Sequence, residues 1–192
     1  MNSAKSYIQL GIFSVIYFFL YFSITAFTAI SPILIVPLAP IAVIIAAIPF
    51  MLFIRRIHQF GLITLMALLL ALTAVLLGDY PLTLLSALIA GSIADSIALL
   101  ARRRKQATLN YLAYSIFALW QSGAFLPFLF LRQSIIKDIE QRFGAEYANN
   151  IAAIFQPLTI VSMLCLVLIA GFIGAIIANK LINKHFARAG HA

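Results

Sequence analysis

Long apolar segments separated by short polar loops dominate this sequence, and they restrict its fold more than any other feature. Six such segments can be read along the chain, at about residues 7–29, 33–54, 60–77, 82–101, 109–131 and 157–182. A helix needs about 20 mostly apolar residues to cross about 30 Å of hydrocarbon. The sequence therefore predicts one all-α membrane domain of six transmembrane helices over residues 1–192, with no separate soluble domain.

Composition supports a membrane protein. The 192 residues are 64% hydrophobic and 9% charged, whereas a soluble domain is about 45–50% apolar. The net charge is +8, but the basic residues lie mainly beside the apolar segments, which is typical of topology signals. We therefore expect the protein to lie in a lipid bilayer and not to bind nucleic acid. The single cysteine, Cys165, excludes an internal disulfide.

A run of four basic residues, Arg102 to Lys105, closes the fourth apolar segment and orients the others. Basic residues beside a membrane span are strongly biased to the cytoplasmic side. With six crossings, only three of the 13 Lys and Arg residues then lie outside, namely Arg132, Lys137 and Arg142. We therefore expect both termini to be cytoplasmic.

The long outer loop, residues 132–156, carries a periodic apolar pattern. Ile135, Ile139, Phe143 and Tyr147 recur every four residues, which predicts a short amphipathic helix that Gly144 interrupts. Such a helix either lies on the membrane surface or covers an opening in the bundle. The sequence leaves both possibilities open.

Motifs for catalysis and nucleotide hydrolysis do not occur in this sequence. It contains no G-x-x-x-x-G-K-[ST] phosphate loop, no H-E-x-x-H, no C-x-x-C and no G-x-S-x-G. The three histidines, His58, His185 and His191, all fall at the predicted cytoplasmic edge. We therefore expect neither an enzyme nor a site for a metal or a cofactor.

Small residues indicate close helix packing on the fourth and sixth segments. They are Ala87, Ala90, Gly91, Ala94 and Ala98, and then Gly171, Gly174, Ala175 and Ala178. Such seams let helix backbones approach closely, and packing inside one bundle is favoured over a partner protein. Asp95 is the only acid within an apolar segment. A structural ion pair with Arg102, Arg55 or Arg56 is favoured for it over a proton relay.

The fifth segment carries the strongest signal for a binding site. Its Trp120-Gln121-Ser122-Gly123 stretch lies near mid-membrane, where an amide needs a partner in the bundle interior or on a ligand. With Arg132 at the outer mouth, the pattern indicates a pocket for a small, partly flat molecule, including an anionic one. A hydrogen bond from Gln121 to another helix is the alternative. The candidate substrate-binding residues are Tyr80, Trp120, Gln121, Phe125, Arg132, Tyr147, Asn150 and Gln156.

Several stretches resemble one known family. They are residues 48–53, 60–61, 114–132 (YSIFALWQSGAFLPFLFLR), 143–147 and 184–190, and they are similar to the Trep_Strep, or MptD-like, family of predicted energy-coupling-factor (ECF) transporter S components. The resemblance implies a six-helix substrate-binding subunit of an importer in the bacterial cell membrane. Its ligand site would open outward, and a T component with two cytoplasmic ATPases would supply the energy. The implied substrate is a water-soluble vitamin or its precursor. The aromatic, apolar character of the sequence adds a tetrapyrrole or metal chelate as a candidate.

The resemblance also bears on the contact with the T component. Many S components carry an Ala-x-x-x-Ala pattern on the first helix, whereas this chain has Gly11 followed by Val15, with Ser14 between them. Gly11 and Ser14 are therefore the candidates for a small-residue coupling face.

Two other classes of function remain as alternatives. A stand-alone secondary carrier would need an ion-coupling group, for which Asp95 is available within a span. A membrane scaffold without ATPase partners would need no such group. A membrane enzyme is disfavoured because no catalytic cluster is present.

Overall fold

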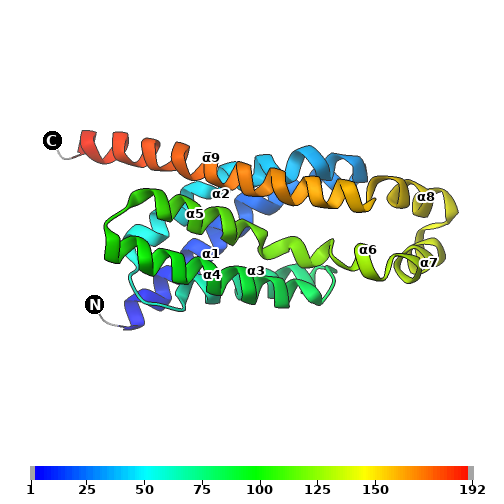
Figure 1. Ribbon diagram of the computed structural model, residues 1–192, viewed down its shortest axis with the longest axis horizontal. Helices are drawn as coiled ribbons and strands as arrows, with labels where there is room; N and C mark the ends of the chain where they lie inside the picture. The colour runs from blue at the N-terminus through cyan, green and yellow to red at the C-terminus, as the bar shows by residue number, and fades with distance from the viewer. Residues whose placement is uncertain (1–2, 190–192) are drawn as a thin grey trace.

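The computed structural model describes residues 3–189, which form helices joined by short turns (Figure 1). The long helices are α1 (Ser3–Thr25), α2 (Ile35–Arg56), α3 (Leu62–Leu76), α4 (Leu82–Arg104), α5 (Ala107–Phe117) and α9 (Pro157–Ala189). The short helices are η1 (Ala26–Ala29), η2 (Pro32–Leu34), η3 (Ala118–Ala124), α6 (Pro127–Phe130), α7 (Arg132–Phe143) and α8 (Ala145–Ile154). The all-α prediction is confirmed for these residues.

The long helices lie side by side along the longest axis of an elongated bundle (Figure 1). The start of α1, the end of α4 with its Arg102 to Arg104, and the end of α9 all lie at one end of the bundle, which we call the basic end. Helices α7 and α8 lie at the opposite end, which we call the α7–α8 end. The basic run and the long loop therefore lie at opposite ends, as their predicted placement on opposite sides of a membrane requires.

Four helices among the described residues are long and apolar enough to cross a membrane. They are Ala4–Thr28, Ile35–Arg56, Leu82–Arg104 and Pro157–Lys184. Helix α3 has 15 residues and is about 22 Å long at about 1.5 Å per residue, and the fifth predicted crossing is interrupted. The structure thus supports a helical membrane protein with several crossings. Six crossings with cytoplasmic termini remain a prediction.

The fifth apolar segment, predicted to cross the membrane over residues 109–131, is not one continuous α-helix. An α-helix covers Ala107–Phe117, tight 3-10 turns replace it over Ala118–Ala124, and one turn of α-helix follows at Pro127–Phe130. Pro127 stands at the start of α6, where its missing N–H costs little. The break occurs before that proline, at the Trp120-Gln121 stretch.

Small residues bring the helices of this bundle close together, as predicted. A Cβ atom added to Gly91 of α4 would come within 2.8 Å of the Thr64 backbone on α3, and one added to Gly174 of α9 within 2.8 Å of the Ile44 backbone on α2. Side chains larger than hydrogen would force these helices apart. The seams therefore serve packing within the chain.

The side chain of Asp95 stabilises the start of α3 and does not form the predicted ion pair. Its Oδ2 atom accepts hydrogen bonds from the backbone N–H of Thr64, at 2.8 Å, and from the Thr64 hydroxyl, at 2.6 Å. Its Oδ1 atom has no hydrogen-bond partner among the described residues, and Arg102 donates to the His58 carbonyl instead. The predicted pairing with Arg102, Arg55 or Arg56 is therefore wrong, because the free N–H groups of the first turn of α3 need an acceptor.

The outer loop forms two helices, not one. Gly144, with a φ of +88°, ends α7, and α8 starts at the next residue. The buried side chains of Ile151, Phe155 and Ile160 pack with Ile139, Phe125 and other apolar residues in a cluster apart from the main core. This cluster holds α7 and α8 against the end of the bundle.

Candidate functional site

The break at η3 creates a polar environment within the bundle. Ser86 of α4 compensates for lost helical hydrogen bonds, because its hydroxyl donates to the Trp120 carbonyl at 2.7 Å and accepts from the Gly123 N–H at 3.0 Å. Irregular backbone at membrane depth is tolerated only where it is buried in protein or lines a cavity. The η3 segment meets both conditions.

Glycine is required at position 123 by the closeness of α4. A Cβ atom there would come within 2.4 Å of the Leu82 carbonyl oxygen and 2.5 Å of the Thr83 Cα. No side chain fits at such distances without moving one of the two segments. The contact fixes η3 against α4, and Gln121 of the same segment lines a cavity.

A cavity of about 350 Å³, which we call the Gln121 cavity, lies between α1, α2, η3 and the turn from α3 to α4. Gln121 and Asp79 supply polar groups to its wall, together with Tyr21, Thr25 and Thr28. The remaining residues in its wall are Phe18, Phe22, Ala26, Ile35, Ala39, Leu77, Ala124 and Phe125. Such a lining, mainly apolar with a few convergent polar groups, is typical of small-molecule sites.

Three residues from separate elements form a hydrogen-bonded chain in this wall. The Tyr21 hydroxyl of α1 donates to Gln121 Oε1, and Gln121 Nε2 donates to Asp79 Oδ2 at 3.3 Å. Trp120 is fully buried behind them, with its ring centroid 5.7 Å from that of Tyr21 in an edge-to-face arrangement. The tryptophan therefore supports the wall of the cavity rather than lining it.

Asp79 is the acidic residue of the cavity and lies in the turn between α3 and α4. Burial raises the pKa of its carboxyl above the usual value, and the hydrogen bond from Gln121 offsets this in part. Desolvation disfavours the charged form of an acid, whereas a donor stabilises it. The site thus holds a carboxylate whose charge is incompletely compensated by the protein.

A second cavity of about 370 Å³ adjoins the first toward the α7–α8 end. Both cavities are lined by Asp79, Ala124 and Phe125. Ile135 of α7 and Phe155, which follows α8, also line the second one. The α7–α8 pair therefore forms part of the wall, which favours a cover over a helix that only rests on the membrane surface.

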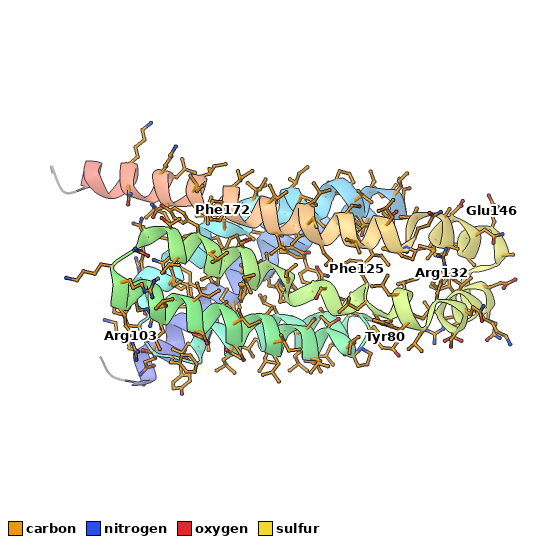
Figure 2. The ribbon with its side chains drawn as sticks, in the orientation of Figure 1. Tyr80, Arg103, Phe125, Arg132, Glu146 and Phe172 are labelled. Atoms are coloured by element: carbon orange, nitrogen blue, oxygen red, sulfur yellow. The ribbon has the colours of Figure 1, made fainter. Side chains whose placement is uncertain are left out.

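The structure gathers three of the predicted binding residues. Gln121 and Phe125 line the first cavity, and Tyr80 and Phe125 line the second. Figure 2 shows Phe125 within the bundle and Tyr80 near the α7–α8 end, opposite Arg103. These positions agree with one site that extends toward the α7–α8 end.

Trp120 lies behind the wall of the Gln121 cavity, and the four remaining predicted binding residues lie elsewhere. The Arg132 guanidinium donates to the Ala152 carbonyl at 2.6 Å, and so it ties α7 to α8 near the tip of the bundle (Figure 2). Tyr147 packs on Phe143, with the ring centroids 5.3 Å apart, and Asn150 and Gln156 are exposed. None of the four lines either cavity, so the cation expected at the pocket mouth is replaced by the carboxylate of Asp79.

Sequence reasoning did not identify Tyr21 and Asp79. Tyr21 lies in an aromatic-rich stretch, Tyr17 to Phe22, where composition does not show which ring faces inward. Asp79 stands in a Gly-Asp-Tyr-Pro turn that is explained by turn formation alone. The tyrosine in an apolar helix was the available signal for Tyr21, since a buried hydroxyl group generally needs a partner.

The predicted coupling residues do not share an exposed face. Gly11 is exposed, and a Cβ added there would meet nothing within 4 Å, whereas Ser14 is 6% exposed. Gly11 and Ser14 therefore lie on different sides of α1, and a coupling role for them stays a prediction. Gly11 instead lies on an apolar exposed side of α1 with Ile8, Ile12 and Val15.

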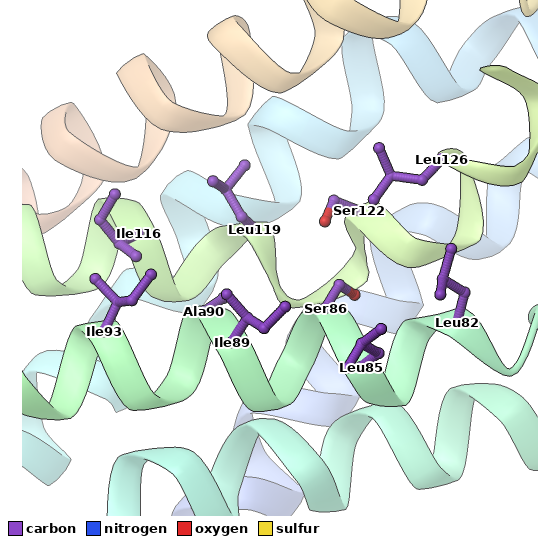
Figure 3. Close-up of a pocket in the computed structure, with 10 residues that line it drawn as sticks. All are labelled: Leu82, Leu85, Ser86, Ile89, Ala90, Ile93, Ile116, Leu119, Ser122 and Leu126. Carbon is purple, nitrogen blue, oxygen red and sulfur yellow. The ribbon is translucent and has the colours of Figure 1, made fainter. Parts of the chain in front are cut away.

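A third cavity, of about 270 Å³, is an apolar groove between α4 and the η3 break (Figure 3). Its polar side chains are Ser86 and Ser122, and the Ser86 hydroxyl is already engaged with the η3 backbone. Leu85, Ile89 and Ile93 on its rim are exposed, as expected of side chains that face lipid. This groove lacks the polar groups of the Gln121 cavity.

Metal ligands are not gathered at either cavity. In the part of the chain that the structure describes, no group of three His, Cys, Asp or Glu side chains could hold a metal ion.

Comparison with known proteins identifies a family. The family model described as a hypothetical bacterial integral membrane protein, Trep_Strep, matches residues 4–188. No curated protein and no solved structure matches the chain. The match covers nearly all of the 192 residues, and the resemblance seen in the sequence is thereby confirmed. The chain belongs to the Trep_Strep family of bacterial integral membrane proteins.

Proposed function

We propose that this protein is the substrate-binding S component of an ECF-type importer, and that it captures a small vitamin-like or cofactor-like molecule from outside. The Gln121 cavity is the observation that carries the proposal. It lies toward the end of the bundle opposite the basic run, which is the outer end if the basic run is cytoplasmic. A site at that end is accessible to a molecule arriving from outside.

The α7–α8 pair supports this proposal as a cover. It is attached through the Ile151, Phe155 and Ile160 cluster, which is separate from the main core. Elements held by few buried contacts open at low free-energy cost. Movement of α7 and α8 would therefore admit a ligand while the bundle stays packed.

The division of labour in such importers also supports the proposal. The sequence contains no phosphate loop for ATP, so energy would come from a T component and two cytoplasmic ATPases. We propose that the exposed side of α1 around Gly11 contacts the T component, because a small residue there permits close approach of another helix.

A stand-alone carrier gains no support from Asp95. That carboxylate is committed to the first turn of α3 through two hydrogen bonds from Thr64. A coupling ion would have to compete with these bonds. These hydrogen bonds to the first turn of α3 explain why an acid lies within the span, and no ion pathway is needed to explain it.

Affinity purification from native membranes tests the proposal. The tagged protein should retain a T component and two ATPases in a mild detergent, as identified by mass spectrometry. Recovery of the chain without them, under conditions that keep a known ECF complex intact, would contradict the S-component assignment.

Two matched variants test the α1 contact in the same experiment. Gly11→Phe should lose the partner proteins, because the ring occupies the space open around Gly11. Val161→Phe, which enlarges an exposed side chain on α9, should keep them. Equal recovery of partners by both variants would remove Gly11 from the interface.

A further inference from the structure

We infer that the Gln121 cavity binds an organic cation with an apolar or aromatic body, whose charged nitrogen contacts the carboxylate of Asp79. The inference deepens the proposed function, since the cation would be the transported molecule. Three features of the cavity carry it: its net charge, the aromatic residues in its wall and its size.

The charge of the cavity is the first feature. Asp79 is partly buried, and among the described residues its carboxylate receives one side-chain hydrogen bond, from the neutral amide of Gln121 at 3.3 Å. A carboxylate offers about four acceptor positions, so most of them remain free for a ligand. No Lys or Arg is part of the lining of either cavity. A cationic ligand would supply the missing counter-charge.

The aromatic wall is the second feature. Phe18, Tyr21, Phe22 and Phe125 all line the Gln121 cavity. The face of an aromatic ring carries negative potential, and a cation above it is attracted, most strongly where water is excluded. Rings and carboxylate together therefore favour a cation and disfavour an anion.

The size of the site sets the class of ligand. The two adjoining cavities, of about 350 and 370 Å³, share Asp79, Ala124 and Phe125. Small-molecule sites are about 300–1,000 Å³, so there is space for a ring system beside the charged nitrogen. An inorganic ion alone would leave the apolar wall unfilled.

From the sequence, Arg132 at the pocket mouth is the reason to include anionic ligands. In the structure Arg132 lines neither cavity, so this reason no longer applies. The guanidinium donates to the Ala152 carbonyl between α7 and α8. The charge that the cavity presents is that of the Asp79 carboxylate, which is negative and favours a cationic ligand.

Three probes with the same phenyl group test the inference in purified protein reconstituted in nanodiscs. They are phenethylammonium, phenethyl alcohol and phenylacetate, which are positive, neutral and negative at neutral pH. Binding is followed by the fluorescence of Trp120, the only tryptophan, whose ring lies 5.7 Å from that of Tyr21 in the cavity wall. Saturation-transfer NMR provides a second measure that does not depend on this signal.

We expect phenethylammonium to bind at least tenfold more tightly than either of the other probes. Asp79→Asn, which keeps the shape of the side chain and removes its charge, should abolish that preference. Asp138→Asn, a matched change at an exposed acid on α7, should preserve it.

Equal or tighter binding of the neutral or negative probe would overturn the inference, and so would the absence of binding by all three in both measurements. These results come from wild-type protein and hold even if Asp79→Asn fails to fold. They are also independent of partner recovery. If the wild-type protein retains the T component and ATPases but shows no preference for the cation, only the ligand class is refuted. If it prefers the cation but retains none of those partners, the importer assignment is refuted.

Discussion

The amide of Gln121 donates a hydrogen bond to the carboxylate of Asp79 at 3.3 Å, although the two residues are 42 positions apart in the sequence. The same amide accepts from the Tyr21 hydroxyl. A broken helix, a turn and the first helix are thereby joined at one wall of a cavity. The Gln121 amide therefore faces a cavity and two hydrogen-bonding neighbours rather than lipid.

The close approach of η3 to α4 predicts a large effect of a single methyl group at Gly123. Gly123→Ala should lower the free energy of unfolding by about 1–3 kcal/mol or more, because the added Cβ would overlap the Leu82 carbonyl at 2.4 Å. Thermal unfolding in detergent measures the loss. Gly11→Ala is the control, since a Cβ there meets nothing within 4 Å, and its stability should be unchanged or raised. Equal stability of the two variants would disprove the tight contact.

The hydroxyl of Ser86 is predicted to hold the break in place. Ser86→Ala leaves the Trp120 carbonyl and the Gly123 N–H without this partner, and the unfolding free energy should fall by about 1–3 kcal/mol. Ser96→Ala removes a hydroxyl that bonds only within α4, to the Ser92 carbonyl, and should change stability by less than about 0.5 kcal/mol. A shift of Trp120 fluorescence in the Ser86 variant alone would report the altered break. An unchanged spectrum and stability would show that Ser86 does not support η3.

The hydrogen bonds from Thr64 to Asp95 predict that two substitutions of Asp95 differ in their effect on stability. Asp95→Ala should destabilise the protein by about 1–3 kcal/mol, because the Thr64 N–H and hydroxyl lose their acceptor. Asp95→Asn keeps an oxygen for these bonds and should lose less. Substrate uptake in cells should survive Asp95→Asn in proportion to the amount of folded protein. Abolished uptake with normal folding would instead favour an ion-coupling role.

The carboxyl of Asp79 predicts a pH dependence of cation binding. Burial raises its pKa above the usual value, so protonation should begin to weaken binding at a pH above the ordinary carboxyl value of about 3.9. Affinity should be highest above the raised pKa, where the carboxylate is charged, and should fall as the pH drops through it. Among the described residues, no other acid and no histidine, lysine or arginine lines the two cavities, whose remaining titratable side chains are Tyr21 and Tyr80. Titration of phenethylammonium against Trp120 fluorescence at a series of pH values measures the effect. A flat profile in wild type, or the same slope in Asp79→Asn, would contradict it.

The sequence predicted the bundle and part of its site because these features depend on local pattern. The lengths of the apolar segments predicted the helices, and the small residues at positions 91 and 174 predicted close helix packing. Gly144 predicted the boundary between α7 and α8. Gln121 was found because an amide in an apolar segment requires a partner.

The remaining features depend on contacts between distant residues. The 3-10 turns at η3 rest on Ser86, which precedes Gly123 by 37 positions, and no breaker residue within η3 before Gly123 marks them. The carboxylate of Asp79 and the hydroxyl of Tyr21 meet Gln121 only in the folded chain. Arg132 was placed at the pocket because of its position after an apolar segment, but the start of α7 directs it to Ala152.

The most direct test of the Gln121 cavity is the molecule that the protein retains on purification from native membranes. Mass spectrometry should detect one small molecule enriched with the wild-type protein and with Gln141→Leu, which changes an exposed glutamine on α7. Gln121→Leu leaves Tyr21 and Asp79 without this partner, so it should fold with reduced stability. The folded protein should lose at least about tenfold of that molecule, because the loss of one or two hydrogen bonds is worth about 1–3 kcal/mol. Equal retention by all three proteins would place the ligand elsewhere and contradict the account.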